Sequence, residues 1–353
     1  MMEQKTVLIV DDMPENIKLI SQLLRGTCKT KVATNGEKAV EIASMDTPPD
    51  LILLDVQMPG MSGFEVCKIL KDQESTRDIP IIFFTSPCDV KDEQRGFELG
   101  AVDFINKPVS PPILSARVHT HLRTKETDDA LKHQTDILDV ALLAMGSLAE
   151  TRNNETRNHI LRTAHFVRTL AEQLRETSPF RETLTADYIK RLHKSAPLHD
   201  IGKTAVPESI LLKPGKLTAE EFEVVKKHTI YGRDAILSAG RELNVSSPYL
   251  KMAAEIACSH HEHWDGSGYP DGLSGNEIPI PGRLMAVADV YDALVTYRVY
   301  KPAFSHEVAI EIIKGARGTQ FEPDVVDAFL AAEADFRKIT LQFSGFEEER
   351  KAL

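Results

Sequence analysis

Five polar residues in the first third of the chain are of the types that can bind a divalent cation and a phosphoryl group. They are Asp11, Asp12, Asp55, Thr85 and Lys107. Three carboxylates held close together would repel one another without a cation, and carboxylate oxygens are ligands that Mg²⁺ prefers. One carboxylate can then attack a phosphoryl group, while the metal and a lysine neutralise the phosphate charge. The residue types therefore predict a phosphorylation site.

Short apolar runs precede these residues and indicate the elements that position them. The clear runs are residues 6–10, 51–54 and 80–84, and weaker strands fit at 30–33 and 101–105. Apolar runs that alternate with helical patterns predict a parallel β-sheet covered on both faces. The functional crevice of such a sheet lies beyond the carboxyl ends of its strands, so we expect the polar residues to meet there.

A second set of candidate residues combines histidines with carboxylates. None of the twelve histidines precedes His119, and eight fall between His159 and His263, which indicates metal or acid–base chemistry in the second half. Glu155 and His159 lie four residues apart on a predicted helix and therefore share a face. The remaining members of the set are His199, Asp200, His228, His260, His261 and Asp289.

Imidazoles combined with carboxylates favour Fe, Mn, Ni or Zn over Mg²⁺ or Ca²⁺. An aspartate can bridge two metals, and a hydroxide held between them is a nucleophile at neutral pH. Such two-metal sites are typical of phosphoester hydrolysis. Any one of these histidines alone would more often be a surface or core residue, so the prediction depends on the whole set.

The two sets are separated by a long helical pattern. Residues 113–145 contain no Gly or Pro, which predicts one continuous helix that leaves the first domain. Apolar residues return along it from Leu131, so it is either a solvated connector or one member of a helix pair in a dimer. After Gly146 the pattern is helical almost throughout, which predicts an all-α second domain.

Composition limits the class of protein. The chain has 353 residues, 42 Lys plus Arg, 53 Asp plus Glu and a formal net charge of −11. Two domains are expected at this length, and an acidic chain without a basic block is a poor candidate for DNA binding. No apolar run approaches the roughly 20 residues that span a bilayer. The four cysteines are scattered, which fits reduced thiols, so we expect a cytoplasmic protein without membrane insertion.

Residues 1–125 resemble the receiver domain of two-component response regulators. The matching motifs are Asp11-Asp12, Leu54-Asp55 with Met58-Pro59-Gly60 after it, Thr85-Ser86 and Lys107-Pro108. The resemblance implies a doubly wound, flavodoxin-like sheet of five parallel strands. It also implies a sensor histidine kinase as partner and Asp55 as the phosphoacceptor. By the same resemblance Asp11, Asp12 and Asp55 hold Mg²⁺, Thr85 and Lys107 contact the phosphate, and Phe104 is the aromatic switch residue.

Residues 150–335 resemble the HD-GYP subgroup of HD-domain phosphohydrolases. The match includes His199-Asp200-Ile201-Gly202-Lys203, His260-His261-Glu262, Gly268-Tyr269-Pro270 and Ala288-Asp289-Val290-Tyr291-Asp292. Members hydrolyse cyclic dinucleotides, chiefly cyclic di-GMP, to the linear dinucleotide and sometimes to mononucleotides. The resemblance implies seven ligands for two metals: His159, His199, Asp200, His228, His260, His261 and Asp289.

The same resemblance implies further roles. Asp200 bridges the two metals that hold the catalytic hydroxide, Lys203 lies beside the scissile phosphate, and Glu155 matches a position that some members use to hold a third metal. The implied substrate contacts are Tyr269, Asp292, Arg298 and Lys301, although Val299 replaces a usual proline beside Arg298. Histidines at positions that match no ligand are expected not to bind metal; these are His165, His193, His263 and His306.

The sequence thus predicts a phosphorylation-regulated cyclic-dinucleotide phosphodiesterase. We expect a receiver domain over 1–125, a helical linker over 126–149, the hydrolase domain over 150–335 and a tail over 336–353, assembled as a homodimer. Two or three ions of Fe, Mn or Ni should bind the hydrolase domain. Alternatives are the same chemistry on mixed cyclic GMP-AMP, a sensor or interaction module that does not hydrolyse the nucleotide, and a phosphohydrolase of linear or alarmone nucleotides.

Overall fold

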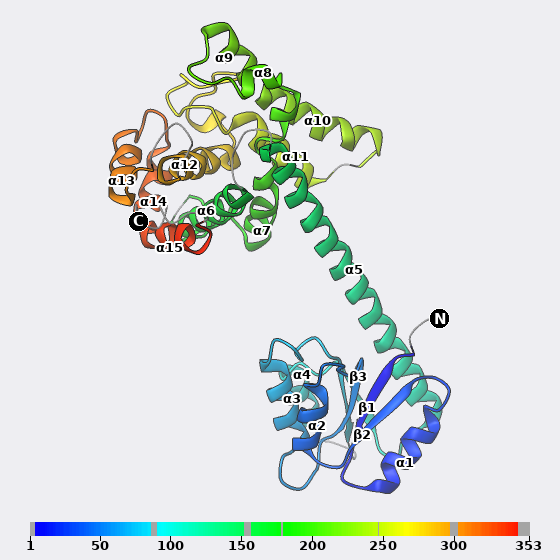
Figure 1. Ribbon diagram of the computed structural model, residues 1–353. Coiled ribbons are helices and arrows are strands. Elements are labelled where there is room, and N and C mark those ends of the chain that lie inside the picture. Colours follow the sequence, from blue (N-terminus) through cyan, green and yellow to red (C-terminus); the bar gives the residue numbers. More distant parts are fainter. Residues whose placement is uncertain are drawn as a thin grey trace. The chain divides into compact units, whose positions relative to one another are not determined.

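The protein folds into two compact units, Met1–Thr135 and Asp136–Leu353, which are described separately (Figure 1). The computed structural model describes residues 4–85, 90–151, 157–177, 179–245, 247–296 and 303–344.

The first unit contains the predicted parallel sheet. Its strands are β1 (Thr6–Val10), β2 (Lys29–Ala33), β3 (Leu51–Asp55), β4 (Ile81–Thr85) and β5 (Asp103–Asn106). All neighbours pair in parallel, in the order β2-β1-β3-β4-β5. The doubly wound fold class is confirmed, and the three clear apolar runs form the central strands of the sheet.

Helices cover both faces of this sheet because successive strand side chains point to opposite sides. Leu8 and Val10 pack toward α2 (Gly36–Ala43) and α3 (Gly63–Asp72). Val7 and Ile9 pack in a second core with side chains of α1 (Pro14–Leu23) and α5 (Pro111–Thr151). A further helix, α4 (Val90–Glu98), follows β4.

Helix α5 is longer than the sequence predicted. It has 41 residues, about 60 Å at about 1.5 Å per residue, because prolines are tolerated in its first turn and Gly146 does not interrupt it. Both units contain part of α5, and the helix has no break at residue 125 or 149. The domain limits at these residues therefore stay a prediction. Ile137, Val140 and Leu148 are exposed on it, which leaves both predicted roles of the helix open.

The second unit is all-α, as predicted. Its longer helices are α6 (Arg157–Arg175), α7 (Ala186–Ser195), α10 (His228–Glu242), α11 (Pro248–Ser259), α12 (Ile280–Val295), α13 (His306–Gly315), α14 (Pro323–Ala331) and α15 (Glu333–Gln342). Two shorter helices are α8 (Glu208–Leu211) and α9 (Ala219–Lys226). Phe166 of α6 stacks on Phe336 of α15 in the main core, with ring centroids 4.4 Å apart.

A regular helix ends immediately before the central motif, and Pro197 lies in the turn that follows it. Helix α7 stops at Ser195, and Ala196–Leu198 continues as a turn of 3₁₀ helix with Pro197 inside it. His199 and Asp200 follow, and Ile201–Ala205 forms another 3₁₀ segment. Among the residues described, no helix is both long enough and apolar enough to cross a bilayer.

Candidate metal centre and phosphorylation site

The carboxyl ends of β1 and β3 bring the predicted aspartates together. Asp11, Asp12 and Asp55 can each direct a carboxylate oxygen within 4.8 Å of the others. The Lys107 ammonium lies 2.7 Å from Asp55 Oδ2 and 3.0 Å from Asp11 Oδ2. The Asn16 amide, which the sequence did not single out, donates to both oxygens of Asp11. The oxygen-rich set fits a hard divalent cation beside a phosphoacceptor.

Electrostatics favour a charged lysine at this site. Burial raises the pKa of the Asp55 carboxyl, an effect that Lys107 only partly offsets. Burial alone would lower the pKa of Lys107, but its contacts with Asp55 and Asp11 raise it above the ordinary value. Lys107 is therefore a fixed cation against which a phosphoryl group could rest.

The predicted switch residues lie on the neighbouring strands. Thr85 is buried at the end of β4. Phe104 of β5 is buried, and its ring centroid is 5.3 Å from that of Phe83 and 5.0 Å from that of Phe97. A Cβ at Gly96 of α4 would come within 2.3 Å of the Phe104 ring, so the present position of this ring requires glycine there.

Sequence reasoning missed a contact between β5 and the start of α5. Asp103 pairs with Arg117, and Nε2 of His121 lies 3.0 Å from its other oxygen. These contacts hold the pKa of Asp103 below its usual range although burial alone would raise it. The strand that precedes Lys107 is thus tied directly to α5.

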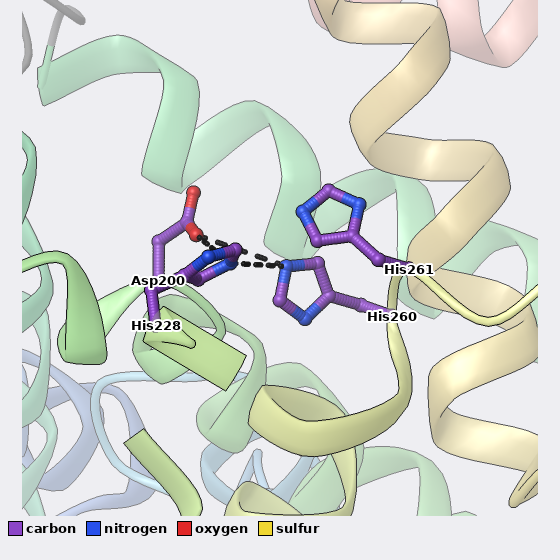
Figure 2. A group of neighbouring side chains, drawn as sticks. All are labelled: Asp200, His228, His260 and His261. Carbon is purple, nitrogen blue, oxygen red and sulfur yellow. Dashed lines mark hydrogen bonds and ion pairs between the residues drawn. The ribbon is translucent and has the colours of Figure 1, made fainter. Parts of the chain in front are cut away.

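In the second unit, imidazoles gather around Asp200 from four separate segments. Asp200 Oδ2 is 3.1 Å from His199 Nε2, and Oδ1 is 3.1 Å from His228 Nε2 and 3.7 Å from His260 Nε2. Figure 2 shows His228 and His260 turned toward Asp200, with His261 beside them. Two groups have the spacing of metal ligands: Asp200 with His228, His260 and His261, and Asp200 with Glu150, His159 and His199. Asp200 belongs to both, as expected of a bridging ligand.

In His159, His199, His228 and His260 the ring nitrogen Nδ1 contacts an oxygen on the side away from the centre. Nδ1 of His199, His228 and His260 lies 3.1, 2.7 and 2.9 Å from the backbone oxygens of Ala196, Val225 and Ile256. Nδ1 of His159 lies 2.7 Å from Asp292 Oδ2. Such contacts fix the tautomer that leaves Nε2 free to bind a metal.

The Nε2 atoms face one another in pairs. The His159 and His199 atoms are 3.4 Å apart, and the His228 and His260 atoms are 3.5 Å apart. When Nδ1 carries the ring proton, two facing Nε2 lone pairs repel unless a proton or a cation lies near them. The donor set therefore fits transition-metal ions.

Asp200 and His261 have the protonation states that metal binding requires. Burial would raise the pKa of Asp200, but Lys203, whose Nζ is 2.5 Å from Oδ2, and His199 bring it well below its usual range. Burial and the nearby His260 lower the pKa of His261 well below its ordinary value. At neutral pH the first is a carboxylate and the second a neutral imidazole, the forms that bind metals.

The predicted residues Tyr269 and Asp289 lie at the edge of the centre. Tyr269 stacks on His261 with ring centroids 4.8 Å apart, and burial raises the pKa of its hydroxyl. Asp289 Oδ1 is 3.6 Å from His159 Nε2, although Asp289 belongs to neither of the two groups.

The geometry favours a different role for Asp292 from the predicted substrate contact. Its side chain is buried behind His159, and its two oxygens accept hydrogen bonds from Nε and Nη2 of Arg162 at 2.5 and 2.9 Å. Burial would raise the pKa of Asp292, but Arg162 and His159 hold it well below its usual range. Asp292 is placed to orient the His159 imidazole, and sequence reasoning had not singled out Arg162.

Three predicted residues lie outside the described part of the chain: Glu155, Arg298 and Lys301. In contrast, Glu150 joins the His159 group although the sequence analysis did not single it out. In the sequence, Glu150 is marked only by being a carboxylate that shortly precedes His159.

Backbone packing explains the glycines of the motifs. A Cβ at Gly202 would lie 1.9 Å from the carbonyl oxygen of His228, so only glycine lets the 3₁₀ segment approach α10 this closely. A Cβ at Gly268 would lie 2.2 Å from the amide nitrogen of His263. Glu262, which is buried, accepts hydrogen bonds from the amides of Asp271 and Leu273 and so closes the loop that carries Tyr269.

Comparison with known proteins assigns a family to each part of the chain. Residues 7–119 match the response regulator receiver domain, and residues 141–325 match the HD domain. A Vibrio cholerae protein named probable cyclic di-GMP phosphodiesterase is 48% identical over 97% of this chain and 81% of its own. The cyclic di-GMP phosphodiesterase of Thermotoga maritima is 36% identical over 95% of this chain and 92% of its own.

A third relative matches about half of the chain. It is the 3′3′-cGAMP-specific phosphodiesterase 2 of Vibrio cholerae, 41% identical over 53% of this chain and 33% of its own. The chain therefore belongs to the cyclic di-GMP phosphodiesterase family of response regulators, in which a receiver domain precedes an HD domain.

Proposed function

We propose that the chain hydrolyses cyclic di-GMP to the linear dinucleotide at the Asp200 centre. The observation that carries this proposal is the set of four imidazoles whose Nδ1 atoms are held outward while their Nε2 atoms converge around Asp200. The full-length relatives named cyclic di-GMP phosphodiesterases support this substrate.

Two ion positions follow from the two ligand groups. His228, His260 and His261 would hold one ion and His159 and His199 the other, with Asp200 shared. Iron, manganese or nickel suits these nitrogen and oxygen donors, and the ions would supply Lewis acidity and an activated water. In the first unit, Asp11, Asp12 and Asp55 would hold Mg²⁺.

Residues around the metal positions would bind the substrate and neutralise its charge. Lys203 lies within reach of Asp200 and would neutralise charge that develops on the phosphate. Tyr269, stacked on His261, offers an aromatic surface to a nucleotide. Water adds to one phosphorus, the bond from that phosphorus to the 3′ oxygen breaks, and the 3′ oxygen leaves with a proton. Arg298 and Lys301 remain proposed phosphate contacts on sequence grounds.

The proposal is tested by turnover in a metal-loaded preparation. Purified protein with Mn²⁺ or Fe²⁺ should convert cyclic di-GMP to the linear dinucleotide, whereas His199→Ala and Asp200→Ala should abolish product and lower bound metal. His263→Gln is the matched control, because Nδ1 of His263 pairs with Ser267 Oγ and the residue belongs to neither ligand group. Full turnover in a metal-free preparation would contradict the proposal.

Mixed cyclic GMP-AMP is the second candidate substrate, which the 3′3′-cGAMP-specific relative favours. A direct comparison of kcat/KM for the two dinucleotides decides between them. If nucleotide binds and no product forms with any of the three metals, the chain is a sensor or interaction module instead.

We further propose that a sensor histidine kinase phosphorylates Asp55 and that the chain forms a homodimer through α5. Ile137, Leu138, Val140, Met145 and Leu148 expose a third or more of their surface along consecutive turns of this helix. A second copy of the same helix would cover these apolar side chains. Analytical ultracentrifugation of Val140→Glu beside the unmodified chain tests the dimer.

A further inference from the structure

Helix α5 ends in the metal centre. Glu150 is its penultimate residue, its side chain is fully buried, and its carboxylate lies within 4.8 Å of the ligand atoms of His159, His199 and Asp200. We propose that Glu150 is a carboxylate ligand on the His159 side of this centre, so that the helix from the receiver also supplies a metal ligand. This inference rests on the proposed metal-dependent function and deepens its regulation.

The local packing explains why Glu150 points to the centre. Gly146, one helical turn earlier on the same face, lies against Pro197, and a Cβ there would be 2.3 Å from the Pro197 oxygen. The next turn of that face therefore reaches His199, two residues beyond Pro197. Leu142 is buried with Leu198 and Ala253 in one apolar cluster, which holds this end of the helix.

Charge supports a cation at this position. Glu150 and Asp200 are two buried carboxylates of one ligand group. Buried like charges are stabilised by opposite charge that lies among them. Lys203 contacts Asp200, and a metal ion held by the four side chains would add further positive charge to the group.

The position of Glu150 would let a movement of α5 change metal binding. The first turns of the helix are tied to β5 by Arg117 and His121, and its last turn carries Glu150. A rotation or shift of the helix would therefore change the distance of one ligand from the metal. Phosphorylation could then alter the number of metal ions bound, and not only the access of substrate to the centre.

Metal titration of the purified full-length protein tests this proposal. The apo protein is titrated with Mn²⁺ by calorimetry, and bound metal is counted by elemental analysis after dialysis. We expect Glu150→Gln to bind one ion fewer per chain, or to bind one ion at least tenfold more weakly. Glu126→Gln is the matched control, since Glu126 is exposed on the same helix, and it should bind like the unmodified chain.

A second readout separates a ligand from a residue that only packs. Loss of a residue that only packs should shift the melting temperatures of the apo and the Mn²⁺-bound protein alike, whereas a lost ligand should reduce the rise that Mn²⁺ causes. Glu150→Asp keeps the donor group and should restore part of that rise. If Glu150→Gln does not fold, as judged by circular dichroism, Glu150→Ala replaces it in the titration.

Unchanged metal number and affinity in Glu150→Gln, or in Glu150→Ala if that variant stands in, would overturn the proposal. Because the titration contains no substrate, an unmodified chain that binds metal through Glu150 without hydrolysing a dinucleotide contradicts the proposed function alone. An unmodified chain that binds no Mn²⁺, Fe²⁺ or Ni²⁺ overturns both. Glu155→Gln, assayed in parallel, shows whether the glutamate predicted from the sequence binds an ion of its own.

Discussion

At the residue scale, the orientation of the ligands depends on residues behind them. Asp292 and Arg162 form a buried pair beside His159, whereas Asp327 and Arg317 form an exposed pair that belongs to no ligand group. We expect Asp292→Asn to weaken Mn²⁺ binding by about 10- to 100-fold. It should also lower the free energy of unfolding by about 3–5 kcal/mol, because the buried Arg162 loses the negative charge of Asp292.

Asp327→Asn is the control for that prediction. Loss of an exposed pair changes stability by about 0–1 kcal/mol and should leave Mn²⁺ affinity unchanged. Calorimetry and urea unfolding measure the two quantities. Equal effects of the two substitutions would show that Asp292 does not orient a ligand.

Histidines that are buried or half-buried outside the ligand groups predict a pH dependence of folding. Burial lowers the pKa of His165, His193 and His306 below the ordinary value. The unfolded chain therefore binds more protons below about pH 6.5, and stability present above that pH is lost as the pH falls toward the folded-state values. Trp264, the one tryptophan of the chain, reports unfolding of the second unit in the intact protein.

Urea unfolding of the metal-free chain at pH 7.5 and 5.5, followed by Trp264 fluorescence, measures this effect. The midpoint should be lower at pH 5.5, and His193→Gln should reduce the difference between the two values. A midpoint that rises on acidification would contradict the prediction.

At the residue scale, sequence reasoning predicted a group of side chains that the fold does bring together. His199, Asp200 and His228 were predicted as ligands, and their nitrogen and oxygen atoms do converge. The placement of Asp292 could not be predicted because it depends on Arg162, 130 positions away. Glu150 was missed for the same reason, since its proximity to His199 arises from the packing of α5 against the 3₁₀ turn.

At the element scale, continuous apolar runs predicted the strands well because the sheet is buried on both faces. The ends of α5 were harder to predict, since an N-terminal proline and Gly146 are both compatible with a helix that packing stabilises. The close approach of the 3₁₀ segment Ile201–Ala205 to α10 leaves no periodic pattern in the sequence at all.

That close approach gives an element-scale prediction. Gly202→Ala would place a methyl group 1.9 Å from the His228 oxygen, and it must separate two segments that carry ligands. We expect loss of bound Mn²⁺ together with a fall in unfolding free energy. Gly315→Ala is the control, because nothing lies within 4 Å of a Cβ there, and it should bind metal normally. Normal metal binding by Gly202→Ala would show that the 3₁₀ segment can shift without disturbing the ligands.

At the scale of the whole molecule, the question is whether the two sites are coupled. Asp55 and Lys107 lie at one end of the receiver sheet, β5 is tied to α5, and α5 ends at Glu150. Phosphorylation adds charge beside Lys107 and can bias a two-state arrangement of Thr85 and Phe104. A tenfold change in turnover needs only about 1.4 kcal/mol of differential stabilisation, so modest movement of α5 suffices.

We therefore expect beryllofluoride with Mg²⁺, a mimic of the acyl phosphate, to change turnover, Mn²⁺ affinity or oligomeric state. Asp55→Ala should abolish that response while basal hydrolysis persists, because Asp55 belongs to the receiver and not to the Asp200 centre. A change in Mn²⁺ affinity that disappears in Glu150→Gln would place the coupling at the end of α5. A change in oligomeric state alone would place it on the apolar face of that helix. If the mimic binds and none of the three quantities moves, the receiver does not control this centre.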